Sequence, residues 1–142
     1  MTLPAPVPDI TPETETFWKA TATGRLLIQR CAECERCVWY PRFLCPACHS
    51  TDLLWTEASG RGTVHSATVT SRGILDYKDA GSYVLALVEL DEGPKMLTNV
   101  VECDPAEVFI GQRVEVVFHD TGAGVALPRF RPVTEAVAIP GA

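Results

Sequence analysis

Five of the six cysteines in this sequence fall between Cys31 and Cys48, and four of them form two Cys-x-x-Cys pairs. The pairs are Cys31 with Cys34 and Cys45 with Cys48, and ten residues separate them. Such a pair is typical of a zinc knuckle, in which a tight turn aims two thiolates at one point. Two facing knuckles complete a tetrahedral site, so the spacing predicts a structural metal ion held by four thiolates.

A four-cysteine site leaves the metal no open coordination position, so the ion would contribute folding energy and no Lewis-acid catalysis. Zinc is the expected ion, and the same spacing would also accept iron. Knuckles usually place glycine after the second cysteine, where the backbone is left-handed. Glu35 and His49 stand there in this chain, so we expect either strain at both positions, more at Glu35 than at His49, or a metal site that is partly lost. Cys37 is interpreted as an apolar strand position.

The other candidate groups do not form a catalytic set by their spacing. Cys103 is isolated and follows an acid, whereas a nucleophile needs a base nearby. His65 stands within a predicted strand and His119 at a strand end, and both are interpreted as packed or surface residues. Gly60-Arg-Gly62 is too short for a dinucleotide-binding fingerprint and suits a bulge that opens a strand. The sequence therefore favours a binding or scaffolding role.

Short strands are expected to position the two knuckles. They span residues 25–30, 37–40 and 53–58. Strands that alternate with knuckles in this way are typical of a rubredoxin-like zinc ribbon. Before the ribbon, Thr11-Pro12-Glu13 predicts the start of a helix that packs through Phe17 and Trp18, and Gly24 predicts its end.

From Gly60 onward, alternating side chains predict five β-strands. They span residues 63–70, 83–90, 95–101, 113–118 and 125–130. A helical turn at 104–107, followed by Phe109 and Ile110 packing inward, separates the third strand from the fourth, which is the order of an OB-fold. Residues 71–82 are expected to be a polar, mobile loop. The expected fold is mostly β, with an N-terminal helix, a rubredoxin-like zinc ribbon and a five-stranded OB-fold barrel.

Four parts are expected along the chain. They are an arm and helix at 1–24, the zinc ribbon at 25–55, the OB-fold at 56–133 and a small apolar tail at 134–142. The ribbon–barrel junction is expected within one continuous strand, which would fuse the two rigidly. Clustered cysteines, no recognisable secretory signal and no apolar run near the roughly 18 residues of a membrane span favour the cytoplasm.

The charge balance argues against a nucleic-acid partner. The net charge is −6, from 18 acidic and 12 basic residues. Proteins that bind nucleic acid usually present a basic face, because neutralising phosphates supplies much of their affinity. In this sequence the basic residues are spread thinly.

Several motifs, taken in order, resemble those of bacterial and archaeal zinc-ribbon and OB-fold proteins associated with acyl-CoA enzymes, long catalogued as a domain of unknown function. The resemblance covers residues 13–133. It rests on Phe17-Trp18, Leu27-Ile-Gln-Arg-Cys31, Tyr40-Pro-Arg42, Cys45-Pro-Ala-Cys48, Gly60-Arg-Gly-Thr-Val64, Val88–Pro94, Ile110–Val114 and Leu127–Pro132. The chain departs from the family pattern at Glu35 and His49, and at Tyr40, where a second proline is common.

The resemblance implies a protein partner. Family members are similar to small subunits of thiolase-superfamily enzymes: acetyltransferases that make acylated phenols, archaeal thiolase with hydroxymethylglutaryl-CoA synthase, and steroid side-chain aldolases. The catalytic residues would lie on the thiolase-like protein, and this chain would be a non-catalytic subunit that completes or bridges its acyl-CoA site. The leading expectation is retro-aldol cleavage of a steroid-type side-chain CoA thioester. The alternatives are a thiolase-like acyltransferase or condensing complex, and an OB module that binds nucleic acid.

Two regions are predicted to contact the partner or the acyl-CoA. One is the ribbon surface around Trp39, Tyr40 and Phe43, and the other is the loop at residues 71–82. Arg42, Arg61 and Arg72 are the candidates for meeting CoA phosphates.

Overall fold

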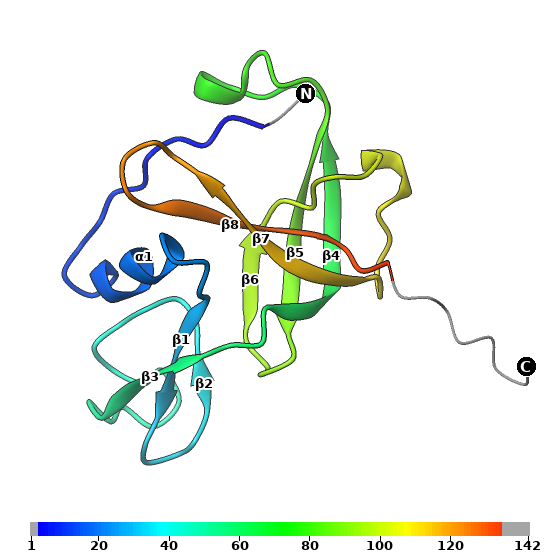
Figure 1. Ribbon diagram of the computed structural model, residues 1–142. Helices are drawn as coiled ribbons and strands as arrows, with labels where there is room; N and C mark the ends of the chain where they lie inside the picture. The colour runs from blue at the N-terminus through cyan, green and yellow to red at the C-terminus, as the bar shows by residue number, and fades with distance from the viewer. Residues whose placement is uncertain (1–2, 135–142) are drawn as a thin grey trace, which may run out of the picture.

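A computed structural model describes residues 3–134 and contains two β-sheets with one helix beside them (Figure 1). The smaller sheet is the ribbon, with β1 (Leu27–Cys31) between β2 (Cys37–Val38) and β3 (Leu53–Glu57). The helix α1 (Glu15–Thr21) buries Phe17 and Trp18. The sequence-based fold class is confirmed: mostly β, with a helix, a ribbon and a curled barrel sheet.

The larger sheet is the barrel, and its strand order is β6-β5-β4-β7-β8. The strands are β4 (Arg61–Thr70), β5 (Tyr83–Leu90), β6 (Lys95–Thr98), β7 (Arg113–Asp120) and β8 (Ala126–Pro132). Two 3-10 turns interrupt them, η1 (Leu75–Tyr77) after β4 and η2 (Pro105–Glu107) after β6. The Asp104 carboxylate caps η2 by accepting from the Ala106 N–H.

The barrel closes where the chain after β6 meets β8. The Phe130 N–H donates to the Asn99 carbonyl at 3.0 Å, and its carbonyl accepts from the Val101 N–H at 2.7 Å. Two residues earlier in β8, Pro128 has no N–H with which to continue this ladder. The closing ladder therefore stops there, and a groove opens between β6 and β8.

One hydrophobic core joins the ribbon base, the helix and the barrel. It contains Phe17 and Trp18 from the helix, Ile28 from β1 and barrel residues such as Val88 and Phe130. A second, smaller cluster surrounds Cys31, Val38 and Cys45 at the far end of the ribbon. The ribbon base is thus held by the same core that holds the barrel.

Several local expectations were wrong. The helix begins at Glu15, because Thr11 and Thr14 close a turn in which the Thr14 N–H donates to the Thr11 carbonyl. Phe109 and Ile110 lie outside the barrel, 58% and 72% exposed. Residues 71–82 are a loop, but the loop contains the 3-10 turn η1 and, against expectation, exposes the apolar side chains of Ile74 and Leu75 at its tip.

The junction between ribbon and barrel also differs from the expected continuous strand. Residues 58–60 separate β3 from β4, which belong to different sheets. The Ala58 N–H donates to the Leu26 carbonyl, and the Ser59 N–H donates to Glu92 in the β5–β6 turn. The strand bulge lies at His65 instead of the two glycines. The tail proposed for residues 134–142 lies, beyond Thr134, outside the described residues.

Candidate functional site

The four knuckle cysteines converge at the outer end of the ribbon. Their Sγ atoms lie within 4.8 Å of one another, with 3.5 Å between Cys31 and Cys48 and 3.7 Å between Cys34 and Cys45. A tetrahedral ion with metal–sulfur bonds of about 2.3 Å holds its ligands about 3.8 Å apart. The donor set and its spacing therefore fit a structural zinc ion.

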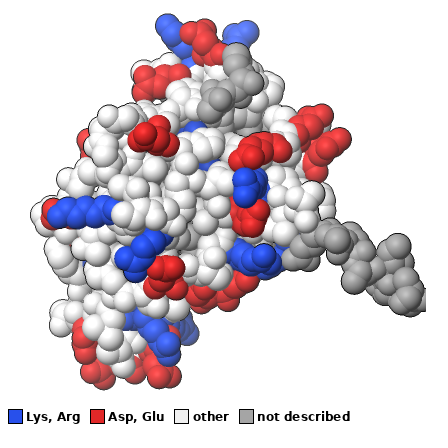
Figure 2. Space-filling model, viewed as in Figure 1, with Lys and Arg blue, Asp and Glu red and all other residues white. Residues whose placement is uncertain are grey.

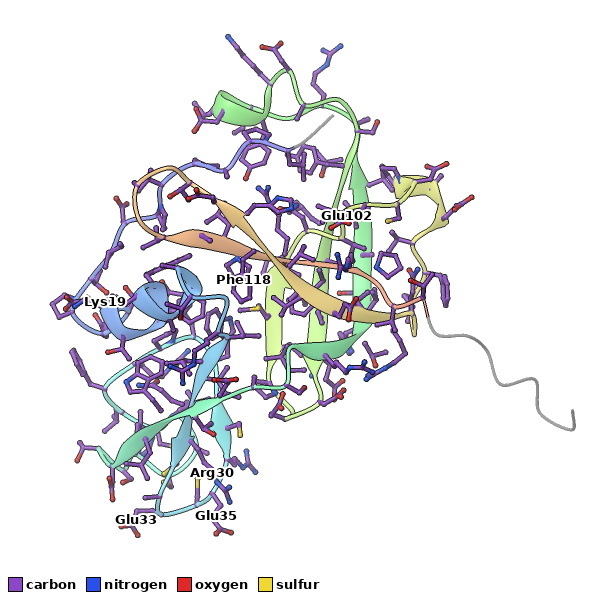
Figure 3. All side chains as sticks on the ribbon, viewed as in Figure 1. Lys19, Arg30, Glu33, Glu35, Glu102 and Phe118 are labelled. Atoms are coloured by element: carbon purple, nitrogen blue, oxygen red, sulfur yellow. The ribbon has the colours of Figure 1, made fainter. Side chains whose placement is uncertain are left out.

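The two knuckles repeat the same backbone hydrogen bonds. In the first, the Glu35 N–H donates to the Cys31 carbonyl, and in the second the His49 N–H donates to the Cys45 carbonyl, both at 2.9 Å. These bonds place Glu35 and His49 in the left-handed region, each with φ of 64°. Figure 3 shows Glu33 and Glu35 pointing away from the protein at this end of the ribbon. The left-handed backbone expected after each second cysteine is therefore confirmed.

The electrostatics of the thiols favour a bound cation. The backbone N–H of Cys48 lowers the pKa of Cys45 to about 6, and the N–H of Cys34 lowers that of Cys31. At Cys48 the N–H of Ser50 acts in the same direction, but burial and the neighbouring sulfurs raise its pKa to about 12. Four thiolates this close repel one another, and a divalent ion would remove that repulsion.

The two remaining cysteines lie apart from this cluster. Cys37 begins β2, and its side chain packs against the shared core of helix and barrel. Burial raises the pKa of Cys103, and the nearby Asp104 and Glu107 raise it further, which suppresses the thiolate that a nucleophile requires. The Nδ1 atom of His119 is not free to act as a base for Cys103, because it accepts a hydrogen bond from Arg129 at 2.8 Å. Neither residue is arranged for nucleophilic catalysis.

A groove of about 350 Å³ brings together parts of both predicted contact regions. Trp39 and Tyr40 of the ribbon line one side, Tyr77 of η1 another, and Leu97 and Pro128 the opening between β6 and β8. Tyr40 is 43% exposed and Leu97 68% exposed. Phe43, which is also exposed, lies on a different hollow of the ribbon beside Gln29 and Trp55.

The three candidate arginines do not gather at one place. Arg42 is on the ribbon, where its Nε donates to the Tyr40 carbonyl and the Gln29 side chain bonds its backbone. Arg61 begins β4 and Arg72 follows its end, so a ten-residue strand about 30 Å long separates them. Because Arg61 and Arg72 stand at opposite ends of β4, the three arginines do not form a shared phosphate site.

On the face shown in Figure 2, acidic and basic side chains are interspersed. Arg25 pairs with Glu57, Arg113 with Asp91, and Arg131 with Glu115. Phe130, an aromatic residue of β8, is fully buried and cannot stack on a base. This face gives no basic groove with exposed aromatics of the kind that holds a single strand.

Two family models match this chain. The rubredoxin-like zinc ribbon domain of ChsH2 matches residues 18–53, and its C-terminal OB-fold domain matches residues 55–119. The chain belongs to the ChsH2-type zinc-ribbon and OB-fold family, also named DUF35. The family recognised from the sequence motifs is confirmed.

Curated relatives carry two kinds of name. A DUF35 domain-containing scaffold protein of Methanothermobacter thermautotrophicus is 37% identical over 63% of this chain and 68% of its own length. A probable enoyl-CoA hydratase alpha subunit of Thermomonospora curvata is 36% identical over 89% of this chain. This DUF35 chain spans only 40% of that subunit, so the longer protein carries sequence that has no counterpart in the match.

Two solved structures that resemble this chain are also described as DUF35 proteins. The chain matches a structure described as the Ltp2-ChsH2(DUF35) aldolase with a TM-score of 0.79 and 36% identity, over 89% of this chain and 98% of that one. A second DUF35 structure, from Sulfolobus solfataricus, has a TM-score of 0.63 at 17% identity and shows the shared fold alone. Within residues 3–134, no helix has the length and apolar character needed to cross a bilayer.

Proposed function

We propose that this DUF35 chain is a non-catalytic subunit that binds a thiolase-like enzyme and completes or bridges its acyl-CoA site. The observation that carries the proposal is the groove between ribbon and barrel, where Tyr40, Tyr77 and Leu97 share one partly exposed apolar surface. Exposed apolar patches with aromatic residues are typical of protein interfaces. The aldolase complex, matched at 36% identity, contains a chain of this family.

The metal centre would support this surface without taking part in chemistry. Cys31, Cys34, Cys45 and Cys48 would hold zinc, which in a closed tetrathiolate site contributes folding energy. The segment between the knuckles carries Tyr40 and Phe43. A folded ribbon therefore presents this segment in a fixed position.

Among acyl-CoA reactions, we propose carbon–carbon cleavage by retro-aldol chemistry on a steroid-type side-chain thioester. The support is the name of the matched aldolase complex, together with a Mycobacterium tuberculosis relative named as a 3-oxo-4,17-pregnadiene-20-carboxyl-CoA hydratase alpha subunit. That relative is 32% identical over 80% of this chain. The catalytic residues would be those of the partner.

Co-expression with a thiolase-like protein from the same organism tests the proposal. We expect the two chains to elute together from a sizing column, and lyase activity on an acyl-CoA substrate to require both. Separate elution, with full activity of the larger protein alone, would refute the assignment. Condensing activity without cleavage would favour the acyltransferase alternative.

A further inference from the structure

Arg129 in β8 is a buried cation without an acidic partner among residues 3–134. Its side chain is 2% exposed, and none of its five hydrogen-bond acceptors is a carboxylate. Its nitrogens donate to Asn99 Oδ1 (3.2 Å), the Leu3 carbonyl (3.4 Å), His119 Nδ1 (2.8 Å), the Pro4 carbonyl (2.6 Å) and the Tyr77 hydroxyl (3.0 Å). Buried arginines usually meet a carboxylate, so an arrangement of five neutral acceptors is unusual.

The acceptors come from separate parts of the fold. Leu3 and Pro4 belong to the N-terminal arm, Tyr77 to η1, Asn99 to the chain after β6, and His119 to β7. Figure 1 shows the arm and the η1 loop side by side above the barrel. One guanidinium therefore fastens the arm and the loop to the barrel wall.

The loop that Tyr77 anchors presents an apolar tip. Ile74 and Leu75 are 76% and 81% exposed, and Leu75 has a positive φ of 52°. The Tyr77 N–H donates to the Ile74 carbonyl at 2.9 Å. Fixing Tyr77 therefore fixes the position of the tip.

The contact with His119 is possible in one protonation state. Arginine can only donate, so His119 Nδ1 must be the acceptor and the ring must be neutral. Protonation would turn Nδ1 into a donor and place a second cation against Arg129. We propose that Arg129 is a latch that holds the arm and the Ile74–Leu75 tip in place, and that protonation of His119 opens it.

The surroundings of His119 give the direction of the pH response. Burial and then the Arg129 charge lower the pKa of His119, while Glu102 acts in the opposite direction. Tyr77 faces the network from η1, and Glu102 is itself paired with Arg131 at 3.6 Å. Tyr83 and Cys103 line the same hollow as His119. A depressed pKa means that the latch is closed above the ordinary value of about 6.5 and loosens as the pH falls below it.

Trypsin can measure the latch in the full chain at pH 7.5, because Arg72 and Lys78 flank the tip. Tyr77→Phe removes one acceptor of Arg129, and Arg129→Met removes the donor. We expect cleavage at these two sites to become faster by about tenfold in Tyr77→Phe, the scale of one hydrogen bond to a charged group. Arg129→Met loses all five hydrogen bonds, so cleavage should be faster by at least as much. Tyr83→Phe is the matched control, since its ring packs on Tyr77 at 5.3 Å without bonding Arg129. Cleavage within twofold of the unaltered chain in Tyr77→Phe would overturn the latch even if Arg129→Met does not fold.

Hydrogen exchange at pH 7.5 and 5.5, corrected for the intrinsic chemical rate, tests the role of His119. We expect the protection of residues 71–82 to fall about tenfold at the lower pH. His119→Asn offers a carbonyl acceptor close to Nδ1 and does not titrate, so its protection should hold. Equal losses in both chains would exclude His119 as the sensor.

Tyr77, which fixes the tip, also lines the docking groove. An open latch should therefore weaken association with the thiolase-like partner, a consequence that rests on the proposed function. The exchange and proteolysis measurements use the chain alone and do not depend on it. If the latch opens and association is unchanged, the docking surface lies elsewhere and the latch stands.

Discussion

At the scale of single residues, the spacing of the cysteines was enough to predict the geometry of the two knuckles. The two Cys-x-x-Cys pairs predict where four sulfurs meet, because a knuckle is a local turn whose geometry depends on few residues. The same rule predicts left-handed backbone at Glu35 and His49, and both have φ of 64°. These positions carry strain that glycine would not.

Replacing either residue by glycine should therefore stabilise the protein. We expect Glu35→Gly and His49→Gly each to raise the free energy of unfolding by about 0.5 to 1 kcal/mol, because relief of left-handed strain exceeds the extra entropy of unfolded glycine. Urea denaturation of the metal-loaded chain measures the change. Glu33→Gly is the control: it lies in the same knuckle without a positive φ, and it should not stabilise. A loss of stability in both test variants would contradict the strain argument.

The cysteines make a second test at this scale. Cys45→Ser should abolish stoichiometric metal binding and unfold the outer ribbon, because three thiolates and an alcohol hold zinc far more weakly. Cys37→Ser, which changes a cysteine outside the cluster, should retain one metal ion per chain. Elemental analysis of purified chains, with far-UV circular dichroism, measures both. Equal metal content in the two variants would mean that the site uses other ligands.

The burial of Arg129 and its hydrogen-bond partners could not be predicted from the sequence. Its neighbours in sequence give no sign that it is buried, because its five acceptors come from positions between 10 and 126 residues away. Only the closed barrel brings them together. A long-range polar network of this kind leaves no local pattern to detect.

At the scale of elements, the strands could be predicted better than their connections. The alternation along β5 (Tyr83–Leu90) gives its bounds directly, since every second side chain enters the core. The start of α1 was missed because a threonine turn precedes it. Phe109 and Ile110 are exposed in a second turn, which the Gln112 N–H closes by donating to the Phe109 carbonyl at 3.2 Å. Turns depend on contacts with distant segments, which periodicity does not reveal.

An ion pair between elements gives a pH-dependent prediction. Arg113 in β7 bonds both carboxylate oxygens of Asp91, at 2.8 and 3.0 Å, and so ties the β5–β6 turn to the far side of β4. Its hydrogen bonds lower the pKa of Asp91, which means that the stabilisation exists above the ordinary carboxyl pKa and is lost as the pH falls through the folded value.

We expect Asp91→Asn to reduce the free energy of unfolding at pH 7 by less than about 1 kcal/mol, because the pair is partly exposed and screened. The difference from the unaltered chain should shrink toward pH 3. Thermal unfolding between pH 3 and 7 measures it, with Asp76→Asn, an exposed residue at the start of η1, as control. A difference that stays constant across this range would show that the amide disturbs packing in the turn instead.

At the scale of the whole molecule, the shared core decides how the parts depend on one another. Phe17 of α1 packs its ring against Trp18 at 4.9 Å and against Trp39 of the ribbon at 4.7 Å, and Trp39 in turn contacts Tyr40. The groove is therefore built jointly by helix, ribbon and barrel. Sequence motifs indicated the ribbon surface and the loop as separate contact regions. Only the packed structure shows that Tyr40 and Tyr77 line one hollow.

If this groove receives the thiolase-like partner, its exposed side chains should carry much of the binding energy. Tyr40→Ala and Leu97→Ala should each raise the dissociation constant tenfold or more, because truncating a central apolar anchor at an interface commonly costs over 1 kcal/mol. Leu54→Ala is the matched control, since Leu54 is 57% exposed on β3 and does not line the groove. Titration calorimetry of each purified variant against the partner measures the three constants, and circular dichroism establishes that each variant is folded. Should Leu54→Ala weaken association while both groove variants bind normally, the partner must contact the outer edge of the ribbon, and the groove must serve another purpose.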